Sequence, residues 1–146
     1  MQALDVQQML QMSHAQLDEL YRSSPAGDIP HGEGNGTLLV APGTKLSDLA
    51  ARFVRHFAWQ GKVFNPERGE LRNEVTPFGI KAVAAKVFKG PSWFDENECI
   101  ILDYSRTSLI AHWVRDEIRE VAPNLYLGIA YLDRIKVANF ALSFPD

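Results

Sequence analysis

The spacing of hydrophobic residues along the chain changes at Trp59. Before this residue, in segments 1–22 and 45–57, apolar side chains recur at the spacing of one face of an α-helix. After it, they alternate with polar ones, as in strands with one buried face. The alternation predicts strands at 60–64, 69–75, 80–88, 98–104, 112–121, 124–132 and 135–144. Turn-forming residues separate most of these segments, so we expect successive strands to pair antiparallel.

The N-terminal segment, residues 1–22, is expected to be helical. Two capping-box patterns begin at Asp5 and Ser13 and predict two short helices in succession. Leu17 and Tyr21 lie on one face of the second helix. A short helix needs a partner surface, so this face is expected to flank the main body or, alternatively, to contact a second copy of the chain.

A loop, a short strand and a further helix are predicted before the alternating region. Glycines and prolines interrupt any regular element in residues 23–36. A strand is expected at 37–40 and an amphipathic helix at 45–57. The apolar stripe of that helix consists of Leu46, Leu49, Phe53, Val54 and Phe57.

Together these elements predict one α+β domain, mainly β, that spans residues 1–146. About seven or eight antiparallel strands in up-and-down order tend to close into a barrel, because closure removes unpaired edges. We therefore expect an up-and-down β-barrel over residues 37–144 that includes the helix at 45–57, with the N-terminal helices attached.

One stretch fits two kinds of element. Residues 107–122 carry apolar side chains at helical spacing, and Pro123 would end such a helix. The β-branched residues of 112–121 and their direct continuation into 124–132 favour strands instead.

Charge and composition narrow the function only slightly. A formal net charge of −3 disfavours broad nucleic-acid binding, which depends on clustered Lys and Arg. The single cysteine, Cys99, lies in an apolar run and is expected to be buried and reduced. The first residues show neither the basic region nor the apolar run that is typical of a secretion signal, and no apolar stretch approaches the ~20 residues that cross a membrane. We expect a cytoplasmic protein without a membrane span.

The segment 112–121 would carry charge on both faces if it is a strand. One face would present His112, Asp116 and Glu120, and the other Arg115, Glu117 and Arg119. Two interpretations stay open. In the first, one polar row lines a pocket in the barrel lumen; in the second, the segment is a solvated strand with cross-strand salt bridges.

Asp103 interrupts a second apolar run. It either pairs with Arg106 across a turn or faces a pocket mouth together with Tyr104 and Arg106, where a buried carboxylate would be a candidate acid or base. The four histidines show no zinc-binding spacing, and no phosphate loop or nucleophile elbow is present. We expect no metal and no cofactor.

The segment Trp59-Gln60-Gly61-Lys62-Val63-Phe64 resembles the Trp-x-Gly core of the uncharacterised bacterial GXWXG-type domains. It is also loosely similar to the opening strand of lipocalins and other calycins. Phe57 stands where the first glycine of that pattern would be, so the match is incomplete. The strand with Arg115 and Asp116, followed by residues 125–128, is similar in layout to later strands of this group. The resemblance implies a lipocalin-like barrel that binds a small, largely apolar ligand, and it identifies no catalytic residue.

Three classes of function remain. The first, which we favour, is binding of a small, largely hydrophobic molecule with a polar end. Its candidate ligand-binding residues are Lys86, Tyr104, Arg115, Asp116 and Tyr126. The second is a cofactor-independent lyase, isomerase or cyclase in the same pocket, with Asp103, His112, Asp116 or Glu117 as acid or base. The third is an interaction or scaffold protein that forms a homodimer.

Overall fold

The computed structural model describes residues 4–40, 62–65, 70–73, 83–103 and 114–144. These residues form the helices α1 (Val6–Leu10) and α2 (His14–Ser23). The strands are β1 (Gly32–Val40), β2 (Lys62–Asn65), β3 (Glu70–Asn73), β4 (Val83–Pro91), β5 (Glu98–Asp103), β6 (Val114–Ala122), β7 (Leu125–Leu132) and β8 (Ile135–Ser143). The helix predicted at 45–57 lies outside the described residues.

Both N-terminal helices begin with the predicted capping boxes. Asp5 Oδ1 accepts a hydrogen bond from the Gln8 backbone N–H at 2.8 Å, and Gln8 Oε1 accepts one from the Asp5 N–H at 2.9 Å. Ser13 and Gln16 repeat this exchange at the start of α2. The bonds satisfy backbone donors that have no partner within a helix. The prediction of two short helices is confirmed.

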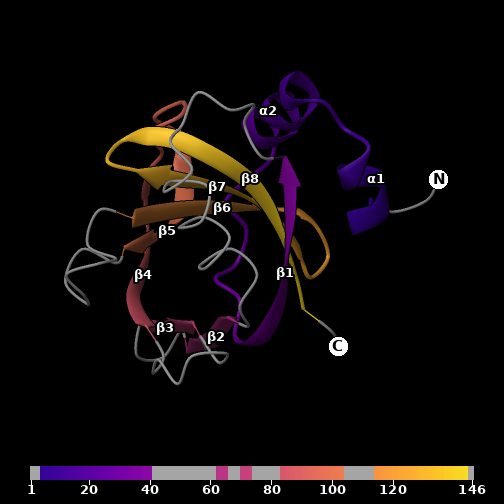
Figure 1. Cartoon of the computed structure of the whole chain (residues 1–146). Coiled ribbons are helices and arrows are strands. Elements are labelled where there is room, and N and C mark those ends of the chain that lie inside the picture. The colour runs from indigo at the N-terminus through magenta and orange to yellow at the C-terminus, as the bar shows by residue number, and fades with distance from the viewer. Residues whose placement is uncertain (1–3, 41–61, 66–69, 74–82, 104–113, 145–146) are drawn as a thin grey trace.

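The strands form one antiparallel sheet in which each strand pairs with the next along the chain. β1 also pairs with β8, so the order of pairing makes a closed barrel, seen as a ring in Figure 1. β1 pairs with a different neighbour in each half. Its first residues, Gly32–Gly34, pair with β2, and residues from Asn35 to Val40 pair with β8. The prediction of a mainly β, antiparallel fold is confirmed.

β1 begins at Gly32, so the prediction of a loop up to residue 36 is wrong at its end. Glycines can pair in a strand because pairing uses the backbone alone. At Gly34 the absence of a side chain also makes room for the ring of Phe144. A Cβ atom on Gly34 would lie 2.6 Å from the ring of Phe144. Glycine inside a strand often marks such a close approach, although the sequence pattern reads as a loop.

Residues 114–122 are strand β6, which confirms the strand interpretation for this part of 107–122. Ile118 of β6 lies opposite Ile100 of β5 and Gly128 of β7. This register places Arg115, Glu117 and Arg119 on one face of the sheet, and Asp116, Ile118 and Glu120 on the other.

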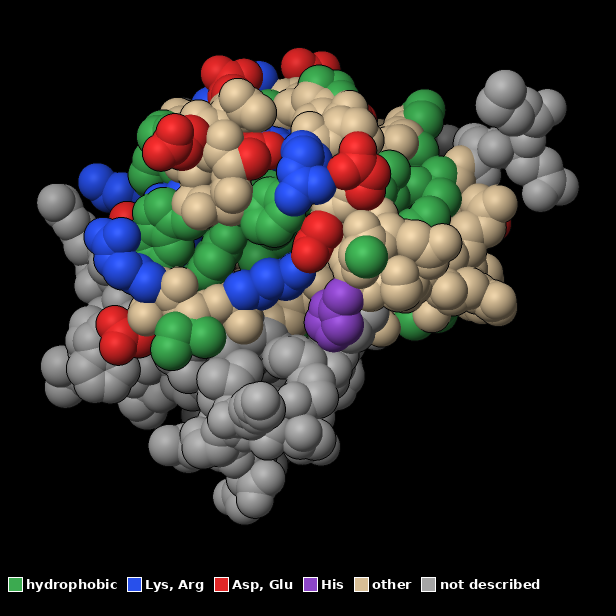
Figure 2. Space-filling view, turned by 90° about the horizontal axis from the view of Figure 1, so that it is seen from above, with side chains coloured by type: hydrophobic (Ala, Val, Ile, Leu, Met, Phe, Trp, Pro, Cys, Tyr) green, Lys and Arg blue, Asp and Glu red, His purple; other side chains and the backbone are tan. Residues whose placement is uncertain are grey.

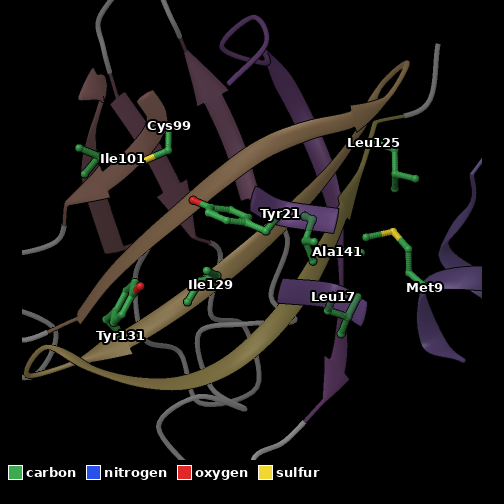
Figure 3. Close-up of a cluster of buried hydrophobic side chains, with 10 residues drawn as sticks. Met9, Leu17, Tyr21, Cys99, Ile101, Leu125, Ile129, Tyr131 and Ala141 are labelled. Atoms are coloured by element: carbon green, nitrogen blue, oxygen red, sulfur yellow. The ribbon is translucent and has the colours of Figure 1, made fainter. Parts of the chain in front are cut away.

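The helices lie outside the ring and cover part of its outer face (Figure 1). Met9, Leu17 and Tyr21 of the helices are fully buried against the strands (Figure 3). Their partners in this cluster are Cys99, Ile101, Leu125, Leu127, Ile129, Tyr131 and Ala141. The prediction that the second helix flanks the main body is therefore confirmed. Neither described helix is long and apolar enough to cross a membrane.

The opposite face of the same strands points into the ring and is closely packed where it is described. The buried side chains on this face include Ile100, Leu102, Ile118, Phe140 and Leu142. Phe140 lies across Gly128, because a Cβ atom on that glycine would be 2.2 Å from the ring. The described inner face thus contributes to the core and leaves these side chains no exposed surface.

Candidate functional site

Three charged side chains of β6 lie on the outer face of the barrel, where α2 and the β4–β5 loop (residues 92–97) pack against them. They are Arg115, Glu117 and Arg119. Burial of charge is costly unless each charged group finds partners, so the hydrogen bonds of these three residues indicate what each one does.

Glu117 is fully buried and accepts four hydrogen bonds. Its Oε1 accepts from the Tyr21 hydroxyl at 3.0 Å and from Ser92 Oγ at 2.6 Å. Its Oε2 accepts from the Trp93 backbone N–H at 2.7 Å and from Arg115 Nη2 at 2.8 Å. The carboxylate thereby connects α2, the β4–β5 loop and β6, and all its strong acceptor positions are occupied.

Arg119 is 1% exposed and has a partner for every N–H it carries. Its Nη1 and Nη2 bind both oxygens of Asp95, at 2.7 and 2.6 Å. The remaining N–H groups donate to the backbone carbonyls of Glu98, Tyr21 and Asn97. Hydrogen bonding to Arg119 lowers the pKa of Asp95 below its ordinary value. This arginine is a structural clamp between the β4–β5 loop and the end of α2.

Arg115 differs from Arg119 because its hydrogen bonding is incomplete. Nη2 donates to the Pro91 carbonyl at 3.0 Å and to Glu117 at 2.8 Å. Nε is buried and has no partner among the described residues, and Nη1 donates to none of them. The guanidinium lies over the Trp93 ring, 4.1 Å from its centroid. A fixed, partly satisfied guanidinium beside an aromatic face is suited to bind an anion.

Arg115 lines a surface pocket of about 540 Å³ on the outer face. The other lining residues are Phe88, Pro91, Ser92, Trp93, Glu96, Ile101, Tyr131 and Arg134. Phe88 and Trp93 are 42% and 40% exposed, which is high for large apolar side chains. Figure 2 shows hydrophobic side chains exposed between basic ones on the face seen from above. The pocket combines apolar walls with a few charged groups, as small-molecule sites commonly do.

Besides Arg115, Trp93 contacts two more of the residues that line this pocket. Arg134, in the β7–β8 turn, also lies over its ring, 4.8 Å from the centroid. Tyr131 meets it edge to face with the centroids 5.2 Å apart. The backbone N–H of Trp93 is fixed by Glu117. These contacts hold the Trp93 backbone and indole in place, while part of the side chain remains exposed to solvent.

The structure divides the predicted ligand-binding residues between two faces. Lys86 pairs in register with Asp103, which pairs with Arg115, so these three form a row on the outer face. Asp116 lies on the inner face opposite Leu102 and is buried. Tyr126 also faces inward, and its hydroxyl donates to the Asp28 carbonyl at 2.5 Å. Tyr104 lies outside the described residues. Of the predicted set, Arg115 lines the pocket.

The predicted acid–base residues are not brought together either. Glu117 is enclosed by its four donors, Asp103 lies on the outer face, and Asp116 lies on the inner face. His112 lies outside the described residues. The described groups therefore offer no paired acid and base around one cavity.

Burial controls the protonation of two groups beside Glu117. Burial, followed by the charge of Glu117, raises the pKa of the Tyr21 hydroxyl far above its ordinary value. The same two causes raise the pKa of the Cys99 thiol to about 12. Both groups thus stay protonated at neutral pH, and Tyr21 remains a hydrogen-bond donor to the carboxylate. Cys99 is a buried hydrophobic residue of the cluster, as predicted.

Sequence reasoning missed most of the pocket. The ligand-binding residues predicted from the sequence include neither Trp93 nor Arg134. A tryptophan directly after the Gly-Pro-Ser turn at 90–92 was the signal that could have found the first. Nothing local signals that Tyr21 meets β6, because the two partners are 96 residues apart.

No protein-family model matches the chain. No curated protein matches it either. Among solved structures, the chain is similar to the crystal structure of a protein from Thermomonospora curvata, with a TM-score of 0.60 and 15% sequence identity. The similarity covers 92% of this chain and 89% of that chain. At this identity it shows a shared fold and no function. The resemblance to GXWXG-type domains and lipocalins stays a prediction.

Proposed function

We propose that this protein binds a small, largely apolar molecule with an anionic end, in the outer-face pocket around Trp93. The observation that carries the proposal is the state of Arg115, which lines the pocket while its Nη1 donates to none of the described residues. Arg119 lies on the same face of β6 and has a structural role. In contrast to Arg115, all of its N–H groups have partners.

The residues that form the walls of the pocket are suited to contact the apolar part of the ligand. Phe88, Trp93, Ile101 and Tyr131 provide aromatic and aliphatic surface around one opening. An aromatic ring packed edge to face against Trp93 or Phe88 would gain aromatic contact energy in addition to the burial of its apolar area. A carboxylate on that ring would meet Arg115, and Arg134 would add a second positive charge.

In this proposal the barrel is a lipocalin-like scaffold, in keeping with its ring of antiparallel strands. The ligand, however, binds outside the ring. The close packing of Phe140 over Gly128 and the burial of Ile118 argue against a lumenal site at this end of the barrel. The barrel then acts as a rigid frame that positions β6, the β4–β5 loop and the β7–β8 turn.

Isothermal titration calorimetry with two matched probes tests the proposal. We expect 3-phenylpropionate to bind with a Kd below about 1 mM, and the neutral 3-phenylpropan-1-ol to bind at least about tenfold more weakly, because it cannot accept charge-assisted hydrogen bonds. Equal binding of the two probes, or binding of neither, would overturn the proposal.

Two variants locate the effect. Arg115→Lys keeps the charge and removes the planar guanidinium, so it should lose most of the preference for the acid. Arg134→Gln should weaken binding of 3-phenylpropionate by about two- to fivefold, as expected for an exposed charge. Lys89→Gln is the matched control, because Lys89 is also exposed but does not line the pocket. Circular dichroism checks that each variant is folded.

A further inference from the structure

The rim of the Trp93 pocket carries charges of both signs. Glu96 and Arg134 both line it, and both are exposed. Within the described part of the chain, neither side chain forms an ion pair. Two opposite charges on one small opening would ordinarily gain by pairing, so their separation leaves room for a molecule that contacts both.

The backbone at these two residues is strained. Glu96 and Arg134 have φ angles of 66° and 67°, in the left-handed region. Among the residues that the structure describes, the other two non-glycine residues with positive φ are Asn124 and Asp133, whose short polar side chains tolerate this conformation. For Glu and Arg the same conformation costs about 1 kcal/mol or more relative to glycine. At Arg134 the two-residue turn of the β7–β8 hairpin requires the positive φ, and glycine would adopt it without this cost. Strain of this kind persists at functional sites where a particular side chain is needed.

The loop that carries Glu96 is built to hold this conformation. The Glu96 N–H donates to the Ser92 carbonyl at 2.9 Å, and the Ser92 N–H donates to the Asn97 carbonyl at 2.9 Å. Ser92 Oγ is in turn fixed by the buried Glu117. The position of the Glu96 backbone at the rim therefore follows from the same network that holds Trp93 and Arg115.

We infer that the ligand carries a cationic group as well as an anionic one, so that the pocket binds an aromatic zwitterion of the α-amino acid type. In this arrangement the carboxylate meets Arg115 and Arg134, the ring packs against the exposed parts of Trp93 and Phe88, and the ammonium group meets Glu96. The inference rests on the proposed function, because it assigns the ligand class of the same pocket. A ligand with only a negative charge would leave Glu96 as an unfavourable like charge near its path.

Calorimetry with three probes of one carbon skeleton tests this inference. They are L-phenylalanine, 3-phenylpropionate without the amino group, and phenethylamine without the carboxylate. At pH 7 we expect L-phenylalanine to bind about two- to fivefold more tightly than 3-phenylpropionate, the range of a partly exposed ion pair, and phenethylamine to bind most weakly.

The variant Glu96→Gln should abolish the advantage of L-phenylalanine while leaving the affinity for 3-phenylpropionate unchanged or higher. Glu98→Gln, which removes an exposed carboxylate that does not line the pocket, should preserve the advantage. If 3-phenylpropionate binds as well as L-phenylalanine and still depends on Arg115, the zwitterion inference fails and the proposed function stands. If neither binds, both fail.

Discussion

The hydroxyl of Tyr21 donates a 3.0 Å hydrogen bond to the buried carboxylate of Glu117, although the two residues are 96 positions apart in the chain. This contact fastens α2 to the outer face of the barrel. Because the same carboxylate also holds Ser92 Oγ, the Trp93 N–H and Arg115, the attachment of the helix and the shape of the pocket share one polar centre.

The variant Tyr21→Phe should lower the free energy of unfolding by about 1–2 kcal/mol, because it leaves a buried carboxylate oxygen with one donor fewer. The ring itself would remain, and with it the contact to Phe94, whose centroid is 5.7 Å away. Urea unfolding followed by circular dichroism measures the change.

Tyr131→Phe is the matched control for this measurement. Its hydroxyl makes no hydrogen bond to the described residues, so its removal should change stability by less than about 0.5 kcal/mol. Equal losses in both variants would show that the Tyr21–Glu117 bond contributes nothing specific.

Stability should fall in alkaline solution, in part because of Tyr21 and Cys99. Burial raises the pKa of both groups in the folded state, and the pKa of the Cys99 thiol reaches about 12. Unfolded, they would ionise near about pH 8.5 for the thiol and about pH 10 for the phenol. Their contribution is therefore fully present below about pH 8 and is lost as pH rises towards the folded values, at up to about 1.4 kcal/mol per pH unit for each group.

Urea titrations between pH 8 and 11 measure this slope. Tyr21→Phe and Cys99→Ala each remove one buried ionising group, so each variant should show a shallower decline than the original chain. An unchanged slope in both variants would mean that other groups cause the alkaline loss.

Glycine at the strained rim positions should stabilise the fold while it weakens binding. Glu96→Gly and Arg134→Gly each relieve a left-handed conformation, and we expect each to raise the free energy of unfolding by about 0.5–1 kcal/mol. The control is Glu98→Gly in strand β5, which should destabilise by a similar amount. Destabilisation by all three substitutions would remove the strain argument for the two rim residues.

The sequence predicted the elements that depend on local chemistry. The capping boxes at Asp5 and Ser13 mark where the two helices begin, because their hydrogen bonds span three residues. The alternation in 114–122 identifies β6 as a strand with charge on both faces. Two interpretations of that strand were left open: a polar row lining the lumen, or a solvated strand with cross-strand salt bridges. Neither describes the row on the outer face, because Arg119 there is buried and pairs with Asp95 of a loop.

The site was less predictable because it depends on which face the helices cover. Period-two alternation separates Arg115 and Glu117 from Asp116, but it does not say which row points into the barrel. The outer row is buried only because α2 and the β4–β5 loop pack over it. Trp93 and Arg134 come together through two turns that are distant in sequence, and no local pattern encodes that contact.

The most direct test of the account is to map where 3-phenylpropionate binds, using ¹H–¹⁵N spectra of the labelled protein during titration. Binding in the outer-face pocket should shift the backbone amides of Trp93, Glu96 and Arg134 and the Trp93 indole N–H, with little change at Ile118 and Leu142. Shifts concentrated at Ile118, Ala130 and Leu142 instead would place the ligand inside the ring and contradict an outer-face site.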